Sequence, residues 1–112
     1  MTGENQRFIQ VEGTVVRLVG QLAVAELKPV EKAMREVVKQ KPETLTLDLV
    51  HVDYMSSSYL GLIVGTASEL EKAGGHVHVK AQGQVLRLLQ LAGVDKVVTI
   101  EECKTWGPPP AP

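Results

Sequence analysis

Apolar and polar residues alternate in two short runs at the start of the chain, over residues 7–11 and 14–19. A period of two is typical of strands that bury one face, so both runs predict β-strands. Glu12 and Gly13 separate the runs and form a turn signal, and Gly20 closes the second run. The opening pattern therefore predicts an antiparallel β-hairpin.

The pattern then changes to the period of a helix. Pro29 suits a first helical turn, and apolar residues recur after it at steps of three and four, at Val30, Ala33, Met34, Val37 and Val38. This spacing predicts a helix over residues 28–40 that stops before Pro42. Residues 44–49 alternate again and include β-branched threonines, which predicts a central strand, and residues 50–55 lead from its end to the next helix.

The rest of the chain continues to alternate between helix and strand. One apolar stripe predicts a helix from the serines after residue 55 to Ala73-Gly74-Gly75, with Leu60, Ile63, Val64, Ala67 and Leu70 on one side. Residues 76–80 read as a strand, residues 84–92 as a helix that ends at Gly93, and residues 97–100 as a last strand or edge. We expect an α/β fold: a mainly parallel mixed sheet of about five strands, led by the hairpin, with three to four helices and right-handed crossovers.

Length and composition bound the organisation of the chain. With 112 residues, of which 44% are hydrophobic, it is long enough to bury a core of its own. We expect a single domain over residues 1–104 and a disordered Pro-rich tail over residues 105–112, for which a role as ligand of a partner's groove stays open. The net charge of -1 provides no basic surface for nucleic acid or an acidic membrane.

Cysteine use and hydropathy predict the compartment. Cys103 is the one cysteine and cannot form an internal disulfide. No apolar run approaches the roughly 18 residues of a membrane span, and no basic and apolar leader precedes the first strand. We therefore expect a cytoplasmic protein without a membrane span.

Three consecutive hydroxyls, those of Ser56, Ser57 and Ser58, stand between the central strand and the next helix. The first N–H groups of a helix have no intrahelical partner and carry partial positive charge, so this position favours serine caps and also oxyanions. One cap needs one serine, which leaves at least one hydroxyl without a capping role. A phosphoserine in this turn would be stabilised by the same amides, while pure capping remains the alternative.

Small residues continue along the same helix. Ser57, Gly61 and Gly65 are spaced four apart and so lie on one face. Two glycines inside a helix cost about 1 kcal/mol each relative to alanine, so something must offset that cost. Close packing against another helix and docking of another protein's backbone both do so, and the spacing alone does not separate them.

Catalytic groups are sparse. His76 and His78 share one face of a short strand, but no third ligand is nearby and Cys103 is isolated, so we predict no metal site. Asp48 and Asp53 flank the end of the central strand, where turn capping is favoured over an acid–base or Mg²⁺ role. The chain has no Gly-x-Ser-x-Gly elbow, Walker loop or dinucleotide fingerprint. We expect neither an enzyme nor a cofactor.

The segment over residues 45–64 reads LTLDLVHVDYMSSSYLGLIV. It resembles the signature of STAS domains, the anti-sigma factor antagonists of bacteria, in which a strand and a short apolar link precede Asp-Ser-Ser-Gly-Leu-Gly at a helix start. The resemblance extends forward through Gly74-Gly75 and Leu91-Ala92-Gly93-Val94 and backward through residues 16–22. It covers residues 7–102 and implies the STAS fold for nearly the whole domain.

The resemblance also implies a switch. In such antagonists a serine at the helix start is phosphorylated by an anti-sigma factor that is also a serine kinase; the unmodified form binds this partner and frees the sigma factor, and the phosphorylated form lets go. Matched by position, the acceptor is Ser58, with Ser57 as second choice, and the partner-binding residues are Ser56, Ser57, Tyr59, Gly61 and Gly65. A bacterial phosphoprotein that regulates transcription is implied, and a homodimer stays open.

Three positions depart from the family pattern. Ser56 stands where the family has aspartate, Tyr59 where it has glycine, and Ala23 where an acidic residue commonly follows the second strand. Tyr59 would add bulk where a partner is expected to approach. The alternative is therefore a STAS scaffold that is not phosphorylated, used as a binding subunit of a stressosome-like or lipid-transport assembly.

Overall fold

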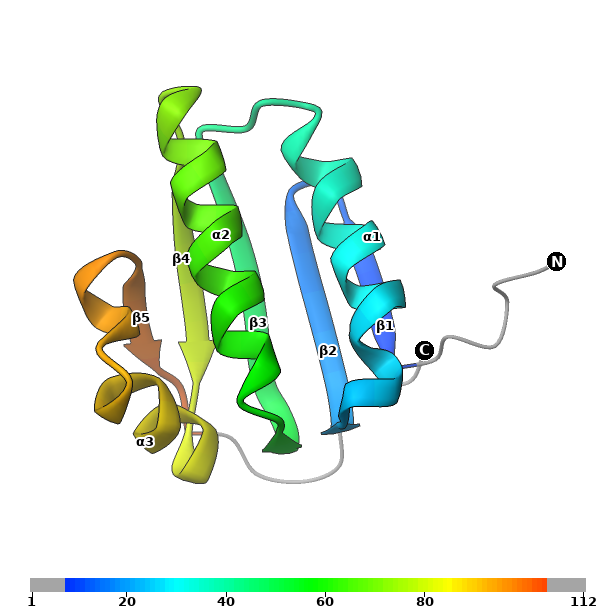
Figure 1. The fold of residues 1–112 in the computed structure, drawn as a ribbon, viewed down its shortest axis with the longest axis vertical. Helices are drawn as coiled ribbons and strands as arrows, with labels where there is room; N and C mark the ends of the chain where they lie inside the picture. The colour runs from blue at the N-terminus through cyan, green and yellow to red at the C-terminus, as the bar shows by residue number, and fades with distance from the viewer. Residues whose placement is uncertain (1–7, 105–112) are drawn as a thin grey trace, which may run out of the picture.

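The computed structural model describes residues 8–104, which form one sheet covered by helices (Figure 1). The strands lie side by side in chain order and are β1 (Ile9–Glu12), β2 (Val15–Leu22), β3 (Thr44–Met55), β4 (His76–Ala81) and β5 (Thr99–Glu102). The helices are α1 (Leu27–Val38), α2 (Ser58–Lys72) and α3 (Gly83–Leu91), with short 3-10 turns η1 (Val24–Glu26) and η2 (Val94–Lys96). The predicted order of strands and helices is confirmed, whereas the predicted tail, residues 105–112, lies outside the described part of the chain.

The sheet is mixed, as the sequence predicted. β1 pairs with β2 in antiparallel register through the turn at Gly13, whose φ of 61° suits glycine. β2, β3, β4 and β5 pair in parallel, so each connection after the hairpin crosses over through a helix. The carboxyl ends of the central strands β2 and β3 therefore meet at one edge of the sheet.

Two strand boundaries differ from the prediction. Residues 50–55, expected as a connection, are the second half of β3, a strand of 12 residues. Its register against β2 shifts between Arg17 and Val19 and again between Gly20 and Gln21, and these irregularities break the alternation that marks a strand in the sequence. β5 begins two residues later than expected because the N–H groups of Val97 and Val98 both donate to the carbonyl of Val94, the buried first residue of η2, and so continue that turn.

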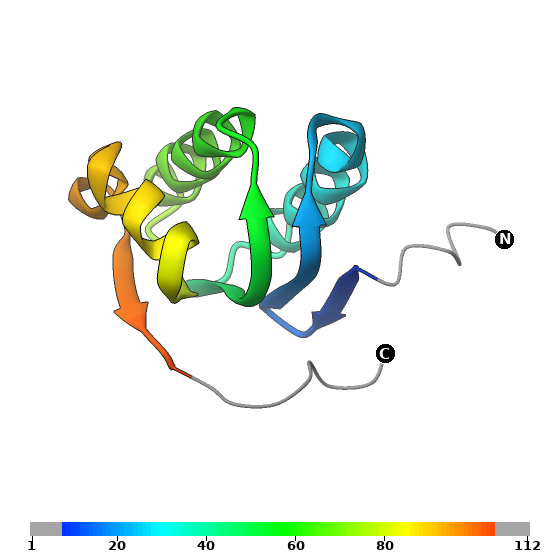
Figure 2. The ribbon, with the colours of Figure 1, turned by 90° about the horizontal axis from the view of Figure 1, so that it is seen from below.

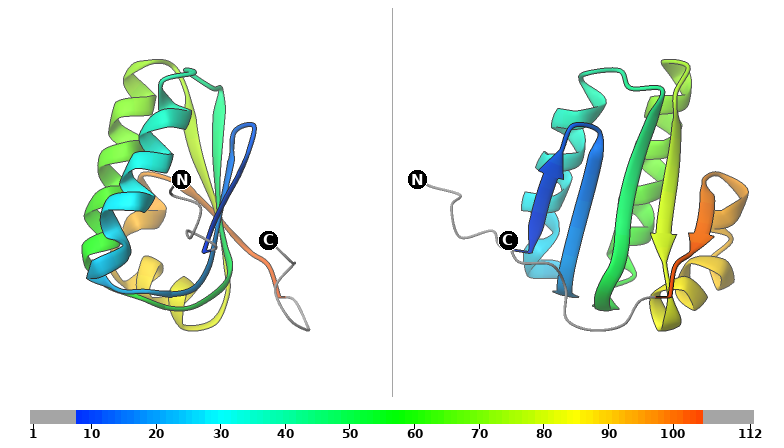
Figure 3. Two further views of the ribbon diagram at one scale, coloured as in Figure 1. Left: turned by 90° about the vertical axis from the view of Figure 1, so that its right-hand side faces the viewer. Right: turned by 180° about the vertical axis from the view of Figure 1, so that it is seen from behind.

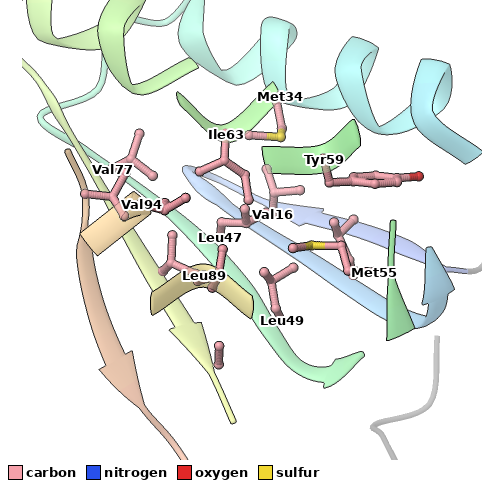
Figure 4. Close-up of a cluster of buried hydrophobic side chains, with 14 of the residues drawn as sticks. Val16, Met34, Leu47, Leu49, Met55, Tyr59, Ile63, Val77, Leu89 and Val94 are labelled. Atoms are coloured by element: carbon pink, nitrogen blue, oxygen red, sulfur yellow. The ribbon is translucent and has the colours of Figure 1, made fainter. Parts of the chain in front are cut away.

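All three helices lie on one face of the sheet, and within residues 8–104 the other face is bare of helices (Figures 2 and 3). The core fills the space between sheet and helices, with side chains such as Leu47, Ile63 and Leu89 no more than 1% exposed (Figure 4). Five residues face one another in register across all strands, and they carry mostly charges of alternating sign: Gln10, Arg17, Asp48, Lys80 and Glu101. Arg17 Nε donates to Asp48 Oδ2 at 3.2 Å within this row.

Candidate functional site at the start of helix α2

The candidate site lies where the two central parallel strands end. Leu22 and Met55, the last residues of β2 and β3, are opposite each other in register. The N–H of Ser56 then donates to the carbonyl of Leu22 at 2.8 Å, which ties the serine turn to the end of β2. The start of α2 and the turn between β2 and α1 therefore lie side by side at the same edge of the sheet (Figure 1).

Ser56 carries the capping role in the serine turn. Its carbonyl accepts the N–H of Tyr59 at 3.0 Å, and its Oγ accepts the N–H of Ser58 at 3.3 Å. Ser57, the residue directly before α2, already has helical backbone angles, and its side chain makes no capping hydrogen bond. One serine thus caps the helix, which leaves two hydroxyls in the first turn free of that role.

The remaining two hydroxyls differ in exposure and in partners. Ser57 is exposed, whereas Ser58 is half-buried and its Oγ lies 2.9 Å from Ser56 Oγ, with either atom able to donate. Within residues 8–104 neither hydroxyl is hydrogen bonded to a carboxylate or a histidine. The turn therefore holds the Ser58 hydroxyl in place but contains no general base of its own, so its modification needs another enzyme.

The prediction that Tyr59 lies on the partner-facing surface is wrong. Its side chain is 1% exposed and belongs to the core, and its hydroxyl donates to the carbonyl of Ala23 at 2.9 Å. Burial, and secondarily the charge of Glu26, raises the pKa of Tyr59 to about 12. Because this position of α2 faces the sheet, the ring adds no bulk where a partner would approach.

The turn after β2 was missed as part of the site. The N–H of Ala23 donates to Glu26 Oε1 at 3.0 Å, and the N–H of Glu26 donates to the Ala23 carbonyl at 3.1 Å. This reciprocal pair closes the turn and leaves Val24 65% exposed beside the serine turn. A glutamate three residues after a helix boundary was the available signal, but nothing in the sequence indicated that this turn meets the serines.

The glycines of α2 border an open groove. Nothing outside the helix lies within 4 Å of a Cβ built on Gly61 or Gly65, so close helix packing, one of the two explanations above, is excluded. The groove runs between α1 and α2 and has a volume of about 240 Å³. Its other lining residues are Glu31, Arg35, Val38, Leu62, Thr66 and Glu69. The glycine face of α2 is therefore exposed and shallow.

The histidines do not converge on a common ligand. His76 Nε2 lies 2.6 Å from Thr99 Oγ1, and His78 Nε2 lies 2.8 Å from Glu101 Oε1, so each pairs separately with β5. No group of three or more His, Cys, Asp or Glu side chains in residues 8–104 could hold a metal ion. Burial and the neighbouring Glu101 raise the pKa of the Cys103 thiol. These residues have structural partners on the bare face of the sheet, away from the serine turn.

The two aspartates also lie elsewhere than predicted. Both belong to β3 itself and do not flank its end. Asp48 pairs with Arg17, and its Oδ1 accepts the N–H of Val50 at 3.0 Å, where the strand changes register. Asp48 thus stabilises an irregularity in the strand, a local role close to the capping that was expected, while Asp53 is exposed.

Among the helices of residues 8–104, none has the length and apolar character needed to cross a bilayer.

Comparison with known proteins identifies the family. The model of the STAS domain matches residues 5–104. The anti-sigma F factor antagonist of Paenibacillus polymyxa is 32% identical over 88 residues, which are 77% of this chain and 75% of that protein. The chain therefore belongs to the STAS domain family, and it is homologous to anti-sigma factor antagonists, which are regulators and not enzymes.

Solved structures agree with this fold. An anti-sigma factor antagonist from Mycobacterium paratuberculosis is 27% identical, with a TM-score of 0.72 over 82% of this chain and 80% of that chain. The antagonist SpoIIAA in its unphosphorylated form has a TM-score of 0.71 at 20% identity over 86% of both chains. Its phosphorylated form, described from Bacillus, has a TM-score of 0.65 at 21% identity over 86% of this chain and 89% of that chain.

Proposed function

We propose that this chain is an anti-sigma factor antagonist in the bacterial cytoplasm that binds an anti-sigma factor with serine kinase activity and is released when Ser58 is phosphorylated. The observation that carries the proposal is the serine turn: Ser56 caps α2 and contacts the Ser58 hydroxyl, which is partly exposed in the first helical turn. The antagonists among its relatives support this reading. Through its partner the protein would regulate transcription.

The proposed docking surface combines the serine turn with the glycine face of α2. Ser57, Gly61 and Gly65 are all exposed and follow one another along the helix. No Cβ covers the backbone at Gly61 or Gly65, so a partner can approach the helix closely there. A helix face without side chains beside a groove favours a tightly packed contact, in which a bulky or charged addition at Ser58 would be poorly tolerated.

A phosphate on Ser58 would weaken partner binding while leaving the fold of the free protein intact. It would add a charge of about -1.5 to -2 in the first turn of α2, where the helix dipole favours negative charge. The free protein can therefore keep its fold. In the docked complex the same charge would lose its water and meet a closely packed partner, which weakens the complex.

The residues that depart from the family pattern are compatible with this switch. Ser56 stands in place of an aspartate but still provides the capping oxygen, through its bond to the N–H of Ser58. Ala23 stands in place of an acidic residue, yet the carboxylate of Glu26 binds the N–H of Ala23 and brings an acid to the end of β2. Two roles expected of the missing acids thus have local substitutes.

Phosphorylation is tested by incubating the chain with the candidate kinase and Mg-ATP and measuring the intact mass. We expect the wild type and Ser57→Ala to gain one phosphate and Ser58→Ala to gain none. No gain in the wild type would exclude the phosphorylation switch with that kinase. A gain that is lost in Ser57→Ala but kept in Ser58→Ala would move the acceptor to Ser57, the second choice.

Release is tested with a charge mimic and its neutral isostere. We expect Ser58→Asp to bind the unmodified protein's partner at least about tenfold more weakly than Ser58→Asn, measured by calorimetry. Both variants add similar bulk, so their difference isolates the charge. Equal affinity of the two variants would instead favour a constitutive binding subunit that is not switched at this position.

A further inference from the structure

We propose that Tyr59 is a positioning residue that locks the turn between β2 and α1 to the serine turn, so that Val24 and the serines reach a partner as one surface. This inference rests on the proposed function for its partner. The lock itself concerns only the free protein. It joins two parts of the chain that are far apart in the sequence: the end of β2 with the adjoining η1, and the start of α2.

Two hydrogen bonds hold the turns together. The Tyr59 hydroxyl donates to the Ala23 carbonyl at 2.9 Å, and the N–H of Ser56 donates to the Leu22 carbonyl at 2.8 Å. The same Ala23 carbonyl also accepts the N–H of Glu26 at 3.1 Å. Tyr59 therefore donates to one of the carbonyls that close η1, and its hydroxyl becomes part of the hydrogen bonding of that turn.

Burial fixes the donor in space. The Tyr59 side chain is 1% exposed, and Figure 4 shows its ring at the margin of the core cluster with the hydroxyl pointing away from it. A ring held on its faces by packing has little freedom, so the position of its hydroxyl is set by the core. With its pKa raised by burial to about 12, this hydroxyl stays protonated, and able to donate, well above the neutral range.

The turn has no comparable anchor of its own. No residue of η1 is buried, and Ala23, Val24 and Ala25 are all exposed. Between Leu22 and Leu27, which border the turn and contact the core, the Tyr59 hydroxyl provides a hydrogen bond from a buried side chain to this turn. A turn without buried side chains opens readily unless such a contact holds it.

The lock matters for recognition because Val24 is 65% exposed on this turn. An apolar side chain held rigidly beside the serines fits an apolar recess on the partner. A turn that is ordered before binding loses less conformational freedom in the complex, so the affinity is higher. We infer that the partner contacts both the serine turn and Val24.

The test uses the full chain and the variant Tyr59→Phe, which removes only the hydroxyl. We expect amide hydrogen exchange at Ala23 and Glu26 to become about fivefold faster and the partner to bind about two- to tenfold more weakly. Ile63→Val is the matched control, since Ile63 is also 1% exposed on α2 but does not touch the turn. It should lower the melting temperature while leaving both readouts at their wild-type values.

A second variant, Val24→Ser, tests the contact at an exposed position where the fold is not at risk. We expect weaker binding with unchanged exchange at Glu26. Unchanged exchange at Ala23 and Glu26 in Tyr59→Phe would overturn the lock, whatever the partner does. Faster exchange with wild-type affinity would overturn its role in recognition. A wild type that binds no anti-sigma kinase would contradict the proposed function, and the exchange measurement would still decide on the lock.

Discussion

Helices α1 and α2 lie next to each other on the same face of the sheet but present opposite kinds of outer surface (Figure 1). The outer face of α1 is charged, with ion pairs between Glu31 and Arg35 at 2.9 Å and between Glu36 and Lys39 at 3.3 Å. The first three turns of α2 carry no charged side chain and expose glycines instead. α1 is built to face water, whereas α2 leaves its backbone uncovered beside the serines.

The difference shows which residues of α2 the fold does not require. Inner positions such as Ile63 and Leu70 are buried as completely as Val30 and Met34 of α1. At the outer positions Gly61 and Gly65 an added Cβ would meet no atom of residues 8–104 outside the helix within 4 Å, and glycine lowers the helix propensity there. A sequence that keeps glycines at open helical positions gives up stability there, and such losses are typical of functional surfaces.

The largest expected effect tests whether the buried faces of α1 and α2 contribute equally to the stability of the fold. Met34→Ala in α1 and Ile63→Ala in α2 should each lower the free energy of unfolding by about 2–5 kcal/mol, because both side chains are 1% exposed in one core. Urea denaturation of both variants provides the measurement. A loss below about 1 kcal/mol for Ile63→Ala alone would show that α2 is only loosely attached.

The second effect concerns Tyr59, the buried ionisable residue in the first turn of α2. Burial raises the pKa of Tyr59 from its ordinary value of 10.0 to about 12, so the neutral form is favoured by folding. Its contribution is complete below pH 10 and is lost as the pH rises toward 12, by about 2–3 kcal/mol in total. Comparing the alkaline stability of the wild type with that of Tyr59→Phe isolates this loss. Identical curves would contradict it.

A smaller effect of opposite sign distinguishes the glycines. Gly61→Ala and Gly65→Ala should each raise the free energy of unfolding by about 1 kcal/mol, since an added Cβ meets nothing within 4 Å, while weakening partner binding. Gly75→Ala is the matched contrast, because its Cβ would lie 2.7 Å from Leu70 Cγ and also meet the Pro42 carbonyl. It should destabilise by about 1–3 kcal/mol. Destabilisation by Gly61→Ala would mean that the glycines serve packing after all.

The smallest effect lies on the outer face of α1. Replacing Glu31 by Gln removes the charge that pairs with Arg35 four residues later, both of them exposed. We expect a loss of about 0.2–0.5 kcal/mol that fades with added salt, measured by thermal denaturation. A loss that salt does not reduce would indicate that Glu31 acts through packing at the groove and not through its charge.

Periodicity was enough to predict most of the architecture. The hairpin, the helices and the order of the strands follow from spacings of two and of three to four, which depend on neighbours in the chain. The second half of β3 was not predicted as a strand, because a register shift beside Asp48 buries two consecutive residues, Leu49 and Val50. A strand that no longer alternates has no local signal.

The site was only half predictable for a related reason. Serine and glycine at the start of α2 mark a cap and a helix face of small residues through their own chemistry, and the family pattern selected Ser58. The direction of Tyr59 depends on Ala23, a residue 36 positions earlier whose carbonyl accepts its hydrogen bond. Contacts between such distant positions are set by how the sheet brings strand ends together, and one sequence does not contain that information.

The row of alternating charges makes the bare face of the sheet different from the face that the helices cover. Arg17, Asp48, Lys80 and Glu101 face one another within the sheet. Their opposite charges therefore compensate one another without the help of a second protein. The bare face is also where the chain carries its one thiol, Cys103, which is half-buried beside Glu101. Attachment to a support through Cys103 would hold the molecule by the face of the sheet opposite the helices and leave the exposed glycines of α2 accessible to a partner.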